Sequence, residues 1–171
     1  MTSDVARVSD IGKLVCAAER KGLELRSKHT LLASYLLQEK AKGEASYWSP
    51  YLVTLPQQFK NMPIFFPPED LAWLKGSMCI EKILERQDSL HLEYDNVCAA
   101  VPEFAQFTYD EFVWARLVVI TRIFGLTIKG DKTDGLVPMA DMLNHRRPRE
   151  TKWTFDDSRN AFTITSLKVK R

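Results

Sequence analysis

The sequence predicts an α+β fold that is mostly α-helical, and three observations support this prediction. In the first two-thirds of the chain, apolar residues recur at helical spacing between capping residues and glycine or proline stops. After Gly125 the pattern changes, and a turn region (KGDKTDG) leads into an extended apolar run. Near the end of the chain, two alternating segments flank a polar turn, as in a β-hairpin. We therefore expect a helical region at 1–125 and a small sheet region at 126–171.

The first two helices have clear start and stop signals. Ser9 and Asp10 can cap a helix that Gly22 ends, and a second helix is expected from near Ser27 to Gly43. The apolar residues of this second helix form one stripe at helical spacing, made of Leu31, Leu32, Tyr35 and Leu36.

Prolines mark the ends and starts of elements in the middle of the chain. Two short apolar turns at 48–55 end at Pro56, and residues 56–68 hold four prolines among aromatic residues, which predicts a packed, irregular loop. Pro67 and Pro68 followed by acidic residues favour a helix start. A long helix is then expected from Cys79 to about Ala100.

The last helix opens with a capping box formed by Thr108 and Glu111, and it is expected to run from Tyr109 to about Phe124. The extended run Leu136-Val137-Pro138-Met139 follows, and the expected hairpin pairs 152–155 with 162–165 around a turn at 157–160.

Composition and charge exclude several classes of protein. The 171 residues suit one ordinary domain, and 45% apolar with 27% charged residues excludes fibrous and wholly disordered chains. No apolar run approaches the ~18–20 residues of a membrane span, and the start MTSDVARVSD lacks the apolar core of a secretory signal. With 24 basic and 22 acidic residues mixed along the chain, the net charge is +2. We therefore expect an intracellular protein that has neither a membrane nor nucleic acid as its main partner.

The chain carries few residues that suit a metal or a nucleophilic site. The three cysteines, Cys16, Cys79 and Cys98, cannot all pair within one chain, form no CxxC and have no histidine at zinc spacing, which predicts buried, reduced thiols and no metal site. His29 and His91 lie in polar helical contexts and are expected at the surface. No phosphate-binding glycine loop, GxSxG or HExxH motif is present.

One segment stands out as a candidate site, LVPMADMLNH at 136–145. A short buried strand is expected to bring Asp141, Asn144 and His145 together onto a loop. The asparagine side chain offers both donors and an acceptor, and groups near it could bind an adenine edge. The alternative interpretation is an Asx-type turn after a strand.

Three passages in order resemble the SET-domain protein methyltransferases, in the branch of the Rubisco large-subunit lysine methyltransferase and the actin histidine methyltransferase. The first is WSPYLVTLPQQF with MPIFFPPEDLAWLKGS, the second is FTYDEFVWARLVVITRIF, and the third is LVPMADMLNH with the hairpin after it. Together they cover roughly residues 45–167. The resemblance implies a helical insertion followed by part of the SET β-core, truncated at both ends.

The resemblance assigns roles to four residues. Asn144 and His145 match the family's Asn-His pair, which contacts the adenine and the amino end of S-adenosylmethionine, and Asp141 matches the acid that supports this loop. Arg122 matches an arginine near the carboxylate of the cofactor or near the substrate, and the alternative for Arg122 is a surface charge at a helix end. Where the family often continues with serine or threonine after the pair, this chain has Arg146-Arg147.

The aromatic side chains are candidates for the hydrophobic core or, alternatively, for a substrate channel. Core packing is the expected role. The residues concerned are Trp48, Trp73, Trp114 and Phe124.

The activity implied is S-adenosylmethionine-dependent N-methylation of lysine in a protein substrate. The family's opening Gly-x-Gly strand has no counterpart before the first helix here. Its catalytic tyrosine near Tyr-Gly has no counterpart either, since all five tyrosines of this chain lie in helical segments upstream of the Asn-His pair. We therefore expect no catalytic residue in this segment, weak or absent cofactor binding, and no activity of the isolated chain. The unfinished sheet edge is expected to cause either weak self-association through the hairpin or high mobility from Asp141 onward. The charges of Lys168, Lys170 and Arg171 should discourage the pairing. The alternatives are a protein histidine N-methyltransferase parent, a non-catalytic helical protein-interaction module, and an adaptor whose Asn-His pair is coincidental.

Overall fold

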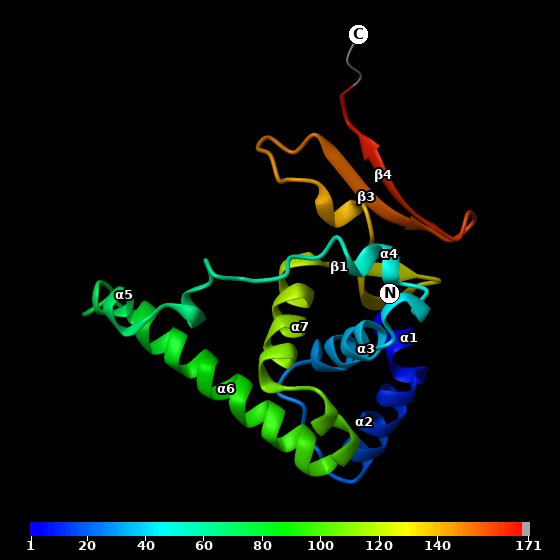
Figure 1. The fold of residues 1–171 in the computed structure, drawn as a ribbon. Coiled ribbons are helices and arrows are strands. Elements are labelled where there is room, and N and C mark those ends of the chain that lie inside the picture. The colour runs from blue at the N-terminus through cyan, green and yellow to red at the C-terminus, as the bar shows by residue number, and fades with distance from the viewer. Residues whose placement is uncertain (169–171) are drawn as a thin grey trace.

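The computed structural model describes residues 1–168 and has the predicted α+β fold, in which helices predominate (Figure 1). Its α-helices are α1 (Ser3–Val8), α2 (Asp10–Arg20), α3 (Thr30–Ala41), α4 (Ser49–Leu52), α5 (Pro68–Ala72), α6 (Met78–Ala100) and α7 (Tyr109–Arg122). Its short 3-10 turns are η1 (Gly43–Ala45), η2 (Pro63–Phe65), η3 (Pro102–Gln106) and η4 (Ala140–Met142). The strands are β1 (Ile123–Ile128), β2 (Asp131–Leu136), β3 (Thr151–Asp156) and β4 (Ala161–Ser166).

Helix α3 is the centre of the core. Residues 30–37 are buried on every side, because α1, α2 and α7 pack around this helix (Figure 1). The prediction of a single apolar stripe on this helix is therefore wrong. Burial of the polar Ser34 is tolerated because its hydroxyl donates to the carbonyl oxygen of Thr30 at 2.8 Å.

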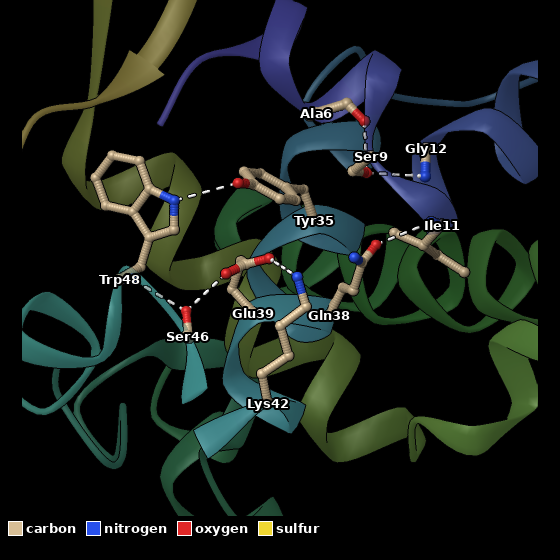
Figure 2. Close-up of polar contacts among 10 residues, drawn as sticks. All are labelled: Ala6, Ser9, Ile11, Gly12, Tyr35, Gln38, Glu39, Lys42, Ser46 and Trp48. Atoms are coloured by element: carbon tan, nitrogen blue, oxygen red, sulfur yellow. Dashed lines mark hydrogen bonds and ion pairs between the residues drawn. The ribbon is translucent and has the colours of Figure 1, made fainter. Parts of the chain in front are cut away.

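Side-chain caps fix the helix starts as expected. The Ser9 hydroxyl accepts from the backbone N–H of Gly12 at 3.0 Å and donates to the carbonyl oxygen of Ala6 at 2.7 Å (Figure 2). It therefore joins α2 to α1, a helix that the sequence did not predict. Thr108 and Glu111 form the predicted capping box at the start of α7.

A polar network joins the end of α3 to α4, the short helix that carries Tyr51. The Trp48 indole donates to the Tyr35 hydroxyl at 3.1 Å, and the Ser46 hydroxyl donates to Glu39 at 2.6 Å (Figure 2). Lys42 pairs with the other oxygen of this buried carboxylate at 2.5 Å. Every buried polar group here has a partner, so the position of α4 is well determined.

The change from helix to strand comes earlier than predicted. Helix α7 ends at Arg122, and Ile123–Ile128 forms β1, which pairs antiparallel with β2. The turn between them needs only Lys129 and Gly130, both at positive φ (52° and 90°), as a two-residue hairpin turn requires. Most of the predicted turn region therefore belongs to β2, and the strand expected at 136–139 ends at Leu136.

The predicted second hairpin is confirmed, since β3 pairs antiparallel with β4 over all six residues of each strand. An aromatic cluster joins this hairpin to β1, because the Phe124 ring meets those of Trp153 and Phe162 edge-on, with centroids at 5.9 and 5.3 Å. Within residues 1–168, the outer edges of β3 and β4 pair with no other strand.

Other expectations have mixed outcomes. Trp48 and Trp114 are half-buried against the core, but Trp73 is 89% exposed, so its predicted core position is wrong. All three cysteines are free, but Cys79 is exposed and none is fully buried. No helix in the described part of the chain is long and apolar enough to cross a membrane.

Candidate functional site

Three elements meet at the buried side chain of Asp141. Turn η4 follows β2, and Met139 at positive φ (71°) redirects the chain so that Asp141 faces inward. The carboxylate is 0% exposed. It accepts a hydrogen bond from the Tyr51 hydroxyl of α4 at 2.8 Å and pairs with the guanidinium of Arg122, the last residue of α7, at 3.1 Å.

The electrostatics of this cluster keep Tyr51 neutral. Burial raises the pKa of the Tyr51 phenol, and the hydrogen bond to Asp141 raises this pKa further. Tyr51 therefore acts as a hydrogen-bond donor and not as a base. The carboxylate charge is balanced by Arg122, whose Nη1 also approaches the carbonyl oxygen of Asp141 at 3.4 Å.

One carboxylate oxygen of the cluster could accept a further hydrogen bond. Asp141 Oδ1 is buried and accepts no hydrogen bond from the described residues, although Oδ2 accepts two. A buried carboxylate oxygen without a donor is costly, so a donor from a ligand, a water molecule or another segment would stabilise it.

Asn144 and His145 lie on the exposed side of the same loop. Both residues are exposed, and neither side chain makes a hydrogen bond or an ion pair within residues 1–168. The structure thus brings Asp141 and Arg122 into contact, while Asn144 and His145 follow a few residues later with their polar groups free. Such a pair can offer donors and acceptors to a small molecule from the surface.

Sequence reasoning missed Tyr51 as part of this site. Its spacing groups it with the apolar residues of the two short turns at 48–55, and its ring lies in the core. Its hydroxyl meets a residue 90 positions away in the chain. No local pattern predicts that contact, although Tyr51 and Asp141 both fall in the passages that resemble SET enzymes.

Other candidate residues do not join this site. His91 is exposed as expected and stacks on Tyr109 at 3.8 Å, whereas His29 is half-buried, with its Nε2 at 3.9 Å from Asp134. Among residues 1–168, no three histidine, cysteine, aspartate or glutamate residues gather as a metal site. Two surface hollows lie along α6 and beside the β1–β2 hairpin, and neither is lined by residues 137–149.

The chain is similar in sequence to several known protein methyltransferases. No family model matches the chain. A ribosomal lysine N-methyltransferase of Schizosaccharomyces pombe is 30% identical over 149 residues, which are 84% of this chain and 27% of that protein. The actin-histidine N-methyltransferase of Gallus gallus is 29% identical over 156 residues, 85% of this chain and 26% of that protein. SET domain-containing protein 4 of Artemia parthenogenetica is 29% identical over 150 residues, 82% of this chain and 37% of that protein.

These relatives are much longer than the region they share with this chain. The chain spans only 27%, 26% and 37% of their respective lengths. Each match takes in more than four-fifths of this chain.

Proposed function

Because the chain is a relative of the SET-domain protein methyltransferases, we propose that it is part of an enzyme that transfers a methyl group from S-adenosylmethionine to a nitrogen atom of a protein side chain. The observation that carries the proposal is the loop anchored at Asp141, which leaves Asn144 and His145 free at the surface.

The cofactor fits the donors and acceptors of this loop. When bound, S-adenosylmethionine supplies a methyl group on a positively charged sulfur. The Asn144 amide can donate and accept, which suits the adenine edge, and His145 offers a ring nitrogen to the amino end. These roles come from the resemblance, and the free polar groups of both residues support them.

Asp141, Tyr51 and Arg122 are positioning residues in this proposal. Two bonds to one buried carboxylate oxygen fix the start of the loop against α4 and α7. The loop is then ordered before the cofactor arrives, so less of the binding free energy is spent on ordering it. Since Arg122 Nη1 is engaged by Asp141, contact between Arg122 and the carboxylate of the cofactor would use its other nitrogen atoms.

We propose lysine as the target residue, with histidine as the second candidate. One relative is named for a ribosomal lysine and another for an actin histidine, and the two match this chain almost equally well. Mass spectrometry of a methylated protein substrate separates the two, because fragment ions locate the added 14 Da, about the mass of one CH₂ group, on one residue type.

The isolated chain of 171 residues is proposed to bind the cofactor weakly and to transfer no methyl group. The tyrosine and the Gly-x-Gly strand of the family have no counterpart in the sequence, and loss of one preorganised catalytic group commonly costs ~10²–10³-fold in rate. A role as a helical protein-interaction module is the alternative for this chain. Methyl transfer to a lysine-containing protein above a control without the chain would contradict the proposed inactivity.

Calorimetric titration of S-adenosylmethionine tests the cofactor site. Asn144→Ala should weaken binding about tenfold, because one polar side chain that bonds a ligand contributes ~1–2 kcal/mol. Asn96→Ala, at an exposed asparagine of α6, is the matched control and should leave binding unchanged. Equal affinity of all three proteins would contradict the assignment of Asn144.

A further inference from the structure

A concentrated positive charge lies directly beside Asn144 and His145. Four cations, Arg146, Arg147, Arg149 and Lys152, occur with a single carboxylate, Glu150, which gives this short stretch a net charge of +3. The whole chain carries only +2. The rest of the molecule is therefore slightly acidic, and positive charge is concentrated on this loop and the start of β3.

The cations of this loop are largely unneutralised. Glu150 accepts from Lys168 at 2.8 Å, whereas its distance to Arg146 is 3.9 Å. Arg146 is 76% exposed, and Arg147 and Lys152 are exposed and form no ion pair within residues 1–168. Exposed cations without an ion-pair partner cost the folded protein little free energy while water hydrates them, but they create a positive electrostatic potential over the loop.

Neighbouring acids do not cancel this potential. Asp156 and Asp157 are at the turn end of the β3–β4 hairpin, whereas the basic loop enters β3 at its opposite end (Figure 1). Six residues of strand separate the two ends by about 17 Å, which exceeds the Debye length of about 8 Å at physiological salt. Asp156 is also engaged, since it accepts from Ser158 and Arg159.

Part of the loop is held in place. The Arg149 guanidinium lies over the Trp153 ring at 4.2 Å, and its Nε donates to the carbonyl oxygen of Thr151 at 2.6 Å. Arg149 therefore covers one face of the exposed aromatic ring. A covered ring is a poor stacking platform for nucleic-acid bases, and four cations form a small surface compared with a nucleic-acid footprint.

We propose that residues 146–152 are a docking surface for an acidic segment of the protein substrate. The inference rests on the proposed function only in calling this partner a substrate. Arg146 and Arg147 would pair with carboxylates in the partner, and their guanidinium groups suit bidentate contact with carboxylates. Because these residues follow His145 directly, an acidic segment bound here would place neighbouring partner residues near the cofactor loop.

Fluorescence anisotropy with a labelled decapeptide of alternating glutamate and serine tests this surface. Arg146→Ala with Arg147→Ala should weaken binding about five- to tenfold at ~50 mM salt, since exposed ion pairs contribute modestly and are screened least at low salt. Arg146→Lys with Arg147→Lys keeps the charge and should restore most of the affinity. Arg20→Ala with Lys21→Ala removes two adjacent exposed cations on the end of α2 and should change binding less than about twofold.

Three outcomes would overturn the proposal. The first is a loss of peptide binding in the Arg20/Lys21 variant as large as that in the Arg146/Arg147 variant. The second is that a peptide with glutamine in place of glutamate binds as tightly as the glutamate peptide. The third is that a single-stranded oligonucleotide of equal charge binds more tightly than the glutamate peptide and depends on Arg146. The peptide experiment needs no cofactor, so its result does not depend on whether Asn144 binds S-adenosylmethionine. If peptide binding behaves as predicted but cofactor binding does not depend on Asn144, that result would therefore contradict only the methyltransferase proposal.

Discussion

At the scale of single residues, the carboxylate of Asp141 has the largest structural role in the candidate site. It is fully buried and receives both the Tyr51 hydroxyl and the Arg122 guanidinium on one oxygen. Removing one partner of such a cluster leaves the other groups without a bond in a place that water reaches poorly. The cluster is therefore expected to contribute to stability as well as to the placement of the loop.

Asp141→Ala should lower the free energy of unfolding by ~2–3 kcal/mol, because it leaves the Tyr51 hydroxyl and the Arg122 charge unpaired. Urea denaturation followed by circular dichroism measures this change. Asp88→Ala, at an exposed position of α6, should change stability by less than ~0.5 kcal/mol. Equal stabilities of the two variants would show that the cluster is not stabilising.

His29 is a second residue with a measurable consequence. Burial lowers the pKa of its imidazole, the positive charges of Arg116, Lys28 and Arg86 lower this pKa further, and Asp134 opposes them. The folded protein therefore binds a proton at His29 less readily than the unfolded chain, whose histidine pKa is about 6.5. Stability rises with pH where the unfolded state binds more protons, so His29 should destabilise the fold as the pH falls below about 7.

His29→Gln should reduce the loss of stability between about pH 7.5 and pH 5.5. Asn96→Ala, at an exposed asparagine of α6, is the control and should keep the wild-type dependence. Burial also lowers the pKa of the Met1 amine to about 6, which acts in the same direction and is common to all three proteins. Thermal unfolding at several pH values measures the effect, and parallel curves for wild type and His29→Gln would contradict it.

At the scale of elements, sequence patterns with local causes were predicted well. The caps at Ser9 and Thr108 and the β3–β4 hairpin depend on residues close together in the chain, and all three are confirmed. The end of α7 was placed too late, because Ile123 and Phe124 suit a helix as well as a strand. Their conformation follows from pairing with β2, which a local pattern does not show.

The open edges of the β3–β4 hairpin give the prediction at this scale. Two-stranded sheets with unpaired N–H and C=O groups tend to pair with another chain. We predict weak, concentration-dependent self-association through this hairpin, opposed by the charge of Lys168; Lys170 and Arg171, which were expected to act similarly, lie outside the described residues. Sedimentation velocity with amide hydrogen exchange tests this. A monomer at every concentration, with residues 151–166 protected like α3, would contradict it.

At the scale of the whole molecule, the fold class could be predicted but the candidate site only in part. Helical periodicity and the change after Gly125 indicate an α+β chain, and the structure has that fold. Residues near one another in sequence, Asp141, Asn144 and His145, were found through their motif. The contacts of Asp141 with Tyr51 and Arg122 depend on how α4 and α7 pack, and the sequence carries no local signal for that packing.

The central claim is that the loop anchored at Asp141 holds S-adenosylmethionine through Asn144 and His145. Backbone amide chemical shifts, recorded by NMR as the cofactor is added, test it most directly because they detect weak binding residue by residue. We predict that the chemical-shift changes are concentrated in residues 139–147, with smaller changes at Tyr51 and Arg122. The Asn144→Ala substitution should reduce these changes. Shifts confined to other parts of the chain, such as the hollow along α6, or no shifts in this loop at saturating cofactor, would contradict the claim.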